Sequence, residues 1–178
     1  MGAIKRRLSG RDVQGELILI LITVGTQRFQ FNRLLRSVDQ LVEEGVLTDS
    51  VIAQIGYSDY KPRHYTYSDF YKLDDINKLT KECDVCITHG GIGSILNALN
   101  CGKKVIVMPR KKILGEHVDD HQSEISAAFQ EKGYIQVAEN MDQLRFLISE
   151  IDDLPFNTYI QEESNLLDAI KAYIETLG

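Results

Sequence analysis

Continuous apolar runs alternate with amphipathic segments along most of this chain. Residues 17–24 (LILILITV) are apolar except for Thr23, which is typical of a strand buried on both faces of a parallel sheet. The apolar side chains from Phe31 to Val42 then recur at helical spacing, and Gly45 ends that helix. This order of strand and helix repeats along the chain.

The same periodicities predict the remaining elements. Strands are expected at 51–55, 65–70, 85–88, 104–108 and 134–137, and helices at 74–82 (with an acidic cap), 92–100, 121–132, 141–151 and 157–177. Such alternation indicates βαβ units with right-handed crossovers, and therefore an α/β fold with a doubly wound parallel, Rossmann-like sheet. We expect one domain over residues 17–178. Residues 1–16 have no periodic pattern and lack the apolar stretch of a signal peptide, so we interpret them as a flexible extension.

Composition narrows the class of protein. The chain has 178 residues, of which 26 are acidic and 20 basic, for a net charge of −6. An acidic protein lacks the basic surface on which nucleic-acid affinity rests, so we expect no nucleic-acid partner. The three cysteines suit a reducing compartment, and no apolar run reaches the length of about 18 residues needed to span a membrane. These features predict a cytoplasmic protein.

The loops that follow the strands carry the candidate chemistry, because ligands of such sheets bind beyond the carboxyl ends of the strands. The segment 87–94 (ITHGGIGS) joins a buried strand to a helix and holds three glycines in four positions. Glycines let the backbone N–H groups approach a ligand, and a helix N-terminus favours an anion, so the loop predicts a phosphate site. The pattern is neither a Walker A motif nor G-x-G-x-x-G. The alternative is a tight turn that needs glycine for packing alone.

The loop at 110–122 (RKKILGEHVDDHQ) is the second polar candidate. Its cations lie where the charge of a diphosphate would need them, and Arg110 is the best placed, whereas Lys111 and Lys112 suit a solvated turn. Its other polar side chains also match metal-ligand types; they are His117, Asp119, Asp120 and His121.

Three further patterns have structural alternatives. The C-x-x-C at 83–86 enters a strand instead of capping a helix, so we interpret both cysteines as buried and structural. The tyrosines between residues 57 and 71 suit either stacking on a base or sugar, or a half-buried edge strand. The apolar stripe of the helix at 157–177 packs either on its own sheet or on a partner subunit.

Residues 18–150 resemble the C-terminal, donor-binding half of GT-B glycosyltransferases, of the family 28 C-terminal type. The segments TVGTQRFQFNRLL, IGYSDYKP and MPR…GEHVDDHQ are most similar to the small soluble subunits of split bacterial exopolysaccharide and capsule enzymes. The small subunit of the eukaryotic dolichol-linked GlcNAc transferase is similar as well.

The resemblance implies a set of substrate-binding residues. The family's His-x-Gly-x-x-Ser diphosphate loop corresponds to His89, Gly90, Gly91, Gly93 and Ser94, and the first glycine turn to Gly25 and Thr26. The pair that contacts sugar hydroxyls corresponds to Asp120 and Gln122. Many relatives hold the ribose with a Glu where this chain has Asn97, so ribose recognition departs from the family pattern.

The resemblance also implies an activity. It implies an inverting hexosyltransferase that uses a UDP-sugar donor without a cofactor or metal, on a polyprenyl-diphosphate-linked acceptor in exopolysaccharide or capsule synthesis. The acceptor site would belong to a membrane-anchored partner subunit, which would hold this chain at the inner face of the membrane. Candidates within the chain for the catalytic base are Glu116, His117 and Asp119. The alternative is a non-catalytic subunit that binds UDP-sugar or stabilises a partner; a UDP-sugar epimerase would need both halves of the fold.

Overall fold

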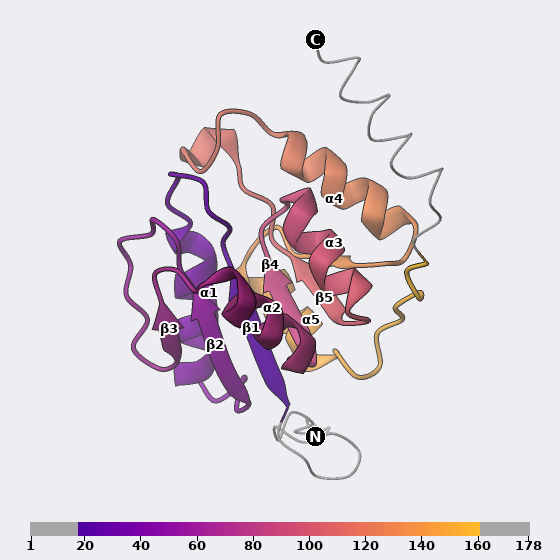
Figure 1. The fold of residues 1–178 in the computed structure, drawn as a ribbon, viewed down its shortest axis with the longest axis horizontal. Coiled ribbons are helices and arrows are strands. Elements are labelled where there is room, and N and C mark those ends of the chain that lie inside the picture. The colour runs from indigo at the N-terminus through magenta and orange to yellow at the C-terminus, as the bar shows by residue number, and fades with distance from the viewer. Residues whose placement is uncertain (1–17, 161–178) are drawn as a thin grey trace, which may run out of the picture.

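The computed structural model describes residues 18–160, which form a single six-stranded parallel sheet with helices on both faces (Figure 1). The strands are β1 Leu19–Thr23, β2 Ser50–Gln54, β3 Thr66–Ser68, β4 Val85–Thr88, β5 Lys104–Val107 and β6 Gln136–Val137. The helices are α1 Asn32–Glu43, α2 Leu73–Glu82, α3 Ile92–Asn100, α4 His121–Glu131 and α5 Met141–Ser149, with a 3-10 turn η1 at Lys112–Leu114. None of the helices in this part of the chain has the length and apolarity to cross a membrane.

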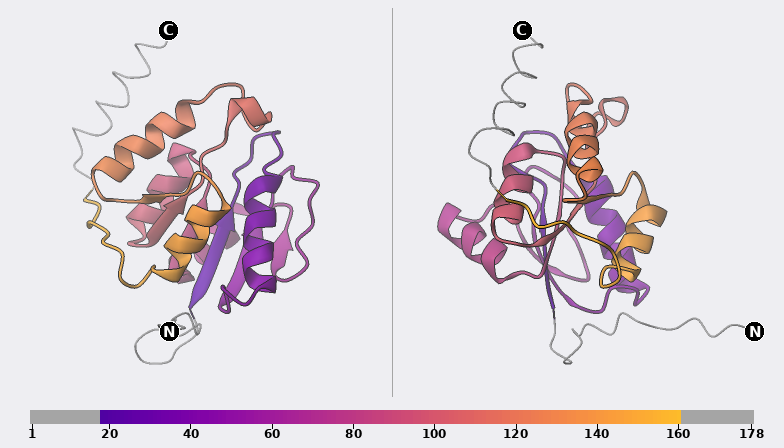
Figure 2. Two further views of the ribbon diagram at one scale, coloured as in Figure 1. Left: turned by 180° about the vertical axis from the view of Figure 1, so that it is seen from behind. Right: turned by 90° about the vertical axis from the view of Figure 1, so that its right-hand side faces the viewer.

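The strand order is β3-β2-β1-β4-β5-β6. Helices α1 and α5 pack against one face of the sheet, where their apolar side chains join those of alternate strand residues such as Ile20 and Ile22. Helices α2, α3 and α4 cover the other face, around Leu21 and Cys86 (Figures 1 and 2). Burial on both faces explains why the strands are continuously apolar. The predicted doubly wound α/β fold is confirmed.

The chain builds one half of the sheet from β1 to β3, and then returns through α2 to begin the other half at β4, which pairs with β1. The loops that follow β1, β4 and β5 therefore meet at the carboxyl edge, where the strand order reverses. Every candidate loop named above lies at this edge.

The ends of several elements differ from the sequence-based expectation. The acidic residues Asp74 and Asp75 lie in the first turn of α2, while its N-cap is Lys72, so the predicted acidic cap is wrong. The helix expected from Asn157 is wrong in its first four residues, which are not helical. The Asn157 side chain instead donates to the Lys132 carbonyl (2.8 Å) and holds the chain against the end of α4. Residues 161–177 of that helix, and the predicted extension 1–16, lie outside the described residues.

The cysteines of the C-x-x-C motif and two of the clustered tyrosines have structural roles. Cys83 and Cys86 are buried and free, and burial raises the pKa of the Cys83 thiol to about 11, which makes it unreactive. The prediction of buried structural cysteines is confirmed. Tyr60 donates to Asp39 and Tyr65 donates to the Leu35 carbonyl (3.1 Å), so both tie the segment before β3 to α1.

Candidate functional site

The glycine loop runs from the end of β4 to the start of α3, with Gly91 as the N-cap of the helix. The strand holds its start rigidly, since the Thr88 hydroxyl donates to the Thr23 carbonyl of β1 (3.0 Å). The N–H groups in the first turn of a helix have no partner within the helix and carry its positive dipole. The predicted arrangement of strand, glycine loop and helix N-terminus is therefore present.

Only one glycine of this loop faces open space. A Cβ on Gly90 would lie 2.7 Å from the Gln122 carbonyl oxygen, and a Cβ on Gly91 would lie 2.3 Å from His89 Nε2. A Cβ on Gly25, which has φ +75°, would lie 2.6 Å from the same imidazole. Around Gly93 no atom lies within 4 Å of the Cβ position. Packing therefore leaves no room for a side chain at Gly25, Gly90 or Gly91, whereas the space beside Gly93 is free for a ligand. The assignment of the other three glycines to substrate binding stays a prediction.

The His89 imidazole is buried between Gly25 and Gly91. Burial, followed by the positive charge of Arg110, lowers the pKa of His89 to about 4, so the ring is neutral at physiological pH. Its Nδ1 lies 3.3 Å from the Thr88 hydroxyl. In this position His89 packs between the loop after β1 and the glycine loop. Any contribution of His89 to anion binding comes from a neutral ring.

Gln122 connects the glycine loop to the loop that follows β5. Its side chain is 2% exposed, and Oε1 accepts hydrogen bonds from the N–H groups of Gly90 (3.1 Å) and Arg110 (3.2 Å). The predicted sugar contact would therefore have to come from the amide nitrogen. Asp120 is exposed at the start of α4, and its Oδ1 accepts from the Lys112 N–H (2.8 Å).

Arg110 is a positioning residue in this structure. Its side chain is 1% exposed, and its guanidinium donates to the carbonyls of Val24 (2.7 Å) and Glu116 (3.0 Å) and of two further residues, Phe29 and Gln30. Burial lowers the pKa of Arg110 to about 10, so it remains a cation. Backbone carbonyls thus take up both terminal nitrogens of the guanidinium, while Nε has no partner among the described residues. Contact between Arg110 and a diphosphate stays a prediction.

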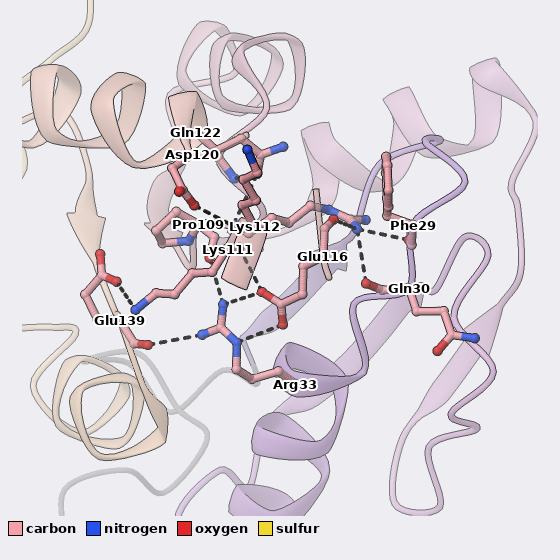
Figure 3. A network of polar contacts seen from close by, with 12 residues as sticks. Phe29, Gln30, Arg33, Pro109, Lys111, Lys112, Glu116, Asp120, Gln122 and Glu139 are labelled. Carbon is pink, nitrogen blue, oxygen red and sulfur yellow. Dashed lines mark hydrogen bonds and ion pairs between the residues drawn. The ribbon is translucent and has the colours of Figure 1, made fainter. Parts of the chain in front are cut away.

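Arg33, on α1, is a positioning residue that the sequence analysis missed. Its guanidinium binds both carboxylate oxygens of Glu116 (2.9 and 2.8 Å) and donates to the carbonyls of Pro109 and Glu139 (Figure 3). Glu116 also accepts from the Lys111 N–H (3.0 Å). A carboxylate held in this way is occupied, so the structure places the base candidate Glu116 in a structural ion pair. The only sequence signal was a cation inside the apolar pattern of α1.

The two other base candidates lie together with His121. His117 is buried, while Asp119 is exposed and uses Oδ1 to accept from the Nδ1 atoms of both His117 (3.0 Å) and His121. Burial opposes ionisation of Asp119, but its hydrogen bonds with His121 and His117 outweigh burial and lower its pKa. The ligand atoms of these three side chains lie within 4.8 Å of one another, which is close enough to hold a metal ion. The expectation of no metal stays a prediction.

The remaining predicted residues lie at the same edge of the sheet but apart from this network. Thr26 is exposed and Ser94 is half-buried beside the open space at Gly93. Asn97 is exposed one turn further along α3, and its amide donates to Asn77 of α2 (3.5 Å). Their assignment to a substrate stays a prediction.

A Rossmann-like sheet with a glycine loop at the N-terminus of a helix defines a nucleotide-binding class of fold. The sequence model of the glycosyltransferase family 28 C-terminal domain matches residues 19–173, and the chain belongs to this family. The resemblance drawn from the sequence is confirmed.

Curated relatives carry one recurring name. The protein called UDP-N-acetylglucosamine transferase subunit ALG13 from Yarrowia lipolytica is 26% identical over 146 residues, which are 73% of this chain and 69% of that protein. The human protein of the same name is 27% identical over 124 residues, which are 65% of this chain but 10% of the human protein.

Solved structures agree with the fold. The NMR structure of ALG13 superimposes with a TM-score of 0.54 at 18% identity, over 85% of this chain and 93% of that one. Os79 from O. sativa, solved in complex with UDP, gives a TM-score of 0.57 at 15% identity, over 76% of this chain but 32% of Os79. The chain thus spans about a third of such a glycosyltransferase.

Proposed function

We propose that this chain is the donor-binding subunit of an inverting, UDP-sugar-dependent glycosyltransferase. The observation that carries the proposal is the open space beside Gly93, at the N-terminus of α3 and next to the Ser94 side chain. The name shared by the curated relatives favours UDP-N-acetylglucosamine as the donor.

The proposed chemistry rests on stabilising the departing diphosphate. The N–H groups at the start of α3 would donate to the charge that develops on the leaving group, and the helix dipole would stabilise the same charge. We assign a further hydroxyl donor to Ser94, and a sugar contact to the amide nitrogen of Gln122. We assign no metal or cofactor to this step, since the helix supplies the positive potential.

The second requirement, a base for the acceptor hydroxyl, is poorly met within this chain. Glu116 is bound by Arg33, and His117 is buried, which leaves Asp119 as the exposed candidate. We therefore infer that a membrane-anchored partner subunit supplies the acceptor site and the base, and holds this chain at the inner face of the membrane. The acceptor we propose is a polyprenyl-diphosphate-linked sugar, in exopolysaccharide or capsule synthesis or in a related glycan pathway.

Calorimetric titration of the isolated chain with UDP and with UDP-N-acetylglucosamine tests the proposal. Both ligands should bind, and Ser94→Ala should weaken binding by about 1–2 kcal/mol, the energy of a hydrogen bond to a charged group. Ser149→Ala is the matched control, because it removes a hydroxyl at the end of α5, at the opposite edge of the sheet. Absence of saturable heat with both ligands would refute the donor site.

The alternative is a subunit that binds UDP-sugar, or stabilises its partner, without taking part in the chemistry. The two hypotheses differ in the reconstituted complex. If the chain holds the donor during transfer, Ser94→Ala reduces transfer to the lipid acceptor along with UDP affinity. If the chain only stabilises its partner, transfer stays unchanged.

A further inference from the structure

Three side chains of metal-ligand type come together in the loop that leads into α4. One ligand atom from each of His117, Asp119 and His121 lies within 4.8 Å of the other two. The Asp119 Oδ1 atom faces both imidazoles, 3.0 Å from His117 Nδ1 and hydrogen-bonded to His121 Nδ1. Ligand atoms on one tetrahedral Zn²⁺ lie about 3.3 Å apart, since each is about 2.0–2.1 Å from the ion. Small side-chain rotations therefore bring all three groups onto one ion.

The site is anchored in the protein on one side and open to solvent on the other. The His117 side chain is 3% exposed, against 51% for Asp119 and 36% for His121. Within residues 18–160, His117 Nε2 is buried without a hydrogen-bond partner. A buried imidazole whose only polar contact is a shared, exposed carboxylate is poorly satisfied by the protein itself. An ion can reach this imidazole past the two accessible ligands.

The fold fixes these ligands close to their binding positions. Glu116, directly before His117, is held by both of its carboxylate oxygens on the Arg33 guanidinium (2.9 and 2.8 Å) (Figure 3). The Phe29 ring lies 5.5 Å from the His117 ring, and the His121 ring stands edge-on to His117 at 4.9 Å, measured between centroids. His121 is also the first residue of α4. Ligands held in this way lose little conformational entropy when an ion binds.

We propose that His117, Asp119 and His121 form a Zn²⁺ site. Two imidazoles and one carboxylate are ligands that Zn²⁺ takes, whereas Mg²⁺ and Ca²⁺ are bound through oxygen. Three protein ligands leave a fourth position for water. The bound ion would tie the loop after β5 to the first turn of α4.

This inference goes beyond the proposed function and changes no part of it. The ion would hold the loop, and UDP binding at the N-terminus of α3 would not require it. Ligation would also occupy Asp119, the exposed candidate for the base, which agrees with a base supplied by the partner subunit.

Calorimetric titration of the metal-free full chain, without a histidine tag, with ZnCl₂ tests the proposal. The wild-type chain should bind one Zn²⁺, and MgCl₂ should give no saturable heat. His121→Ala should weaken Zn²⁺ binding at least about tenfold, because it removes one of three ligands. Asp119→Asn should do the same, although its side-chain oxygen can still accept the hydrogen bonds of the turn. Both side chains are accessible to solvent, so neither change removes a core contact.

His64→Ala is the matched control. The His64 side chain is also 36% exposed, and its Nδ1 lies 3.3 Å from the Asp39 carboxylate. This pair belongs to no group of three ligands in the part of the chain that the structure describes. His64→Ala should therefore bind Zn²⁺ like the wild type.

Thermal unfolding with and without Zn²⁺ gives a second measurement. Zn²⁺ should raise the Tm of the wild type and of His64→Ala, because a ligand of the folded state stabilises it, and should raise it less in Asp119→Asn. The proposal would be overturned by an absence of saturable Zn²⁺ binding, by equal affinities of the wild type and both site variants, or by an equal loss in His64→Ala. UDP titration in EDTA is a separate measurement, and its failure would count against the donor site only.

Discussion

Replacing the glycines of the donor loop one at a time separates packing from ligand binding. The three positions 90, 91 and 93 have similar sequence surroundings but different space, since only the Cβ position of Gly93 is open. Residue 93 lies in the first turn of α3. Gly93→Ala should raise the free energy of unfolding by about 0.5 kcal/mol, because it lowers the conformational entropy of the unfolded chain. In Gly90→Ala the new Cβ would press on the backbone carbonyl of Gln122. This overpacking should lower the free energy of unfolding by about 1–3 kcal/mol.

For Gly93→Ala, the expected effects on stability and on UDP binding have opposite signs. If the diphosphate occupies the space beside Gly93, Gly93→Ala should weaken UDP binding at least about tenfold while the protein becomes more stable. Urea denaturation followed by circular dichroism measures the stability, and calorimetry measures the affinity. A Gly93→Ala protein that binds UDP like the wild type would refute the placement of the ligand. A Gly90→Ala protein as stable as the wild type would refute the packing argument.

Three further predictions concern the ion pair, a buried acid and metal. Arg33→Met leaves the buried Glu116 carboxylate without its ion-pair partner and should lower the free energy of unfolding, measured by urea denaturation, by about 2–3 kcal/mol. Adding Glu116→Gln to this variant should recover much of the loss. Equal losses in the single and the double variant would contradict the pairing. Asp49 is buried, and burial followed by the charge of Asp152 raises its pKa to about 6, against the smaller opposing effect of the Ile18 backbone. The folded state thus keeps a proton that the unfolded chain loses near pH 4, so the free energy of unfolding falls as the pH rises from about 4 to 6. Asp49→Asn should add about 1–2 kcal/mol to the free energy of unfolding at pH 8 and nothing at pH 4. An equal gain at both pH values would contradict the assignment. UDP binding should survive EDTA, and a strict requirement for Mn²⁺ or Mg²⁺ would instead point to the cluster around Asp119 as ligands.

Local patterns determined the fold class and the position of the donor loop. Strands buried on both faces are continuously apolar, and helices show their spacing directly, so β4 and α3 match their predicted bounds. In a parallel sheet with right-handed crossovers, a loop that follows a strand falls at the carboxyl edge, and so the glycine loop must lie there. These conclusions depend only on residues close together in the chain.

Contacts between distant residues were decided only by the tertiary structure. Arg33 and Glu116 are 83 positions apart, and no periodicity shows that their charges pair. A basic loop next to a phosphate site predicts that Arg110 faces the ligand, but carbonyls from the loop after β1 surround its guanidinium instead. The sequence likewise shows three glycines in the loop, and only the packing of His89 and Gln122 reveals that Gly93 alone faces free space, because steric room depends on which side chains the fold brings against the backbone.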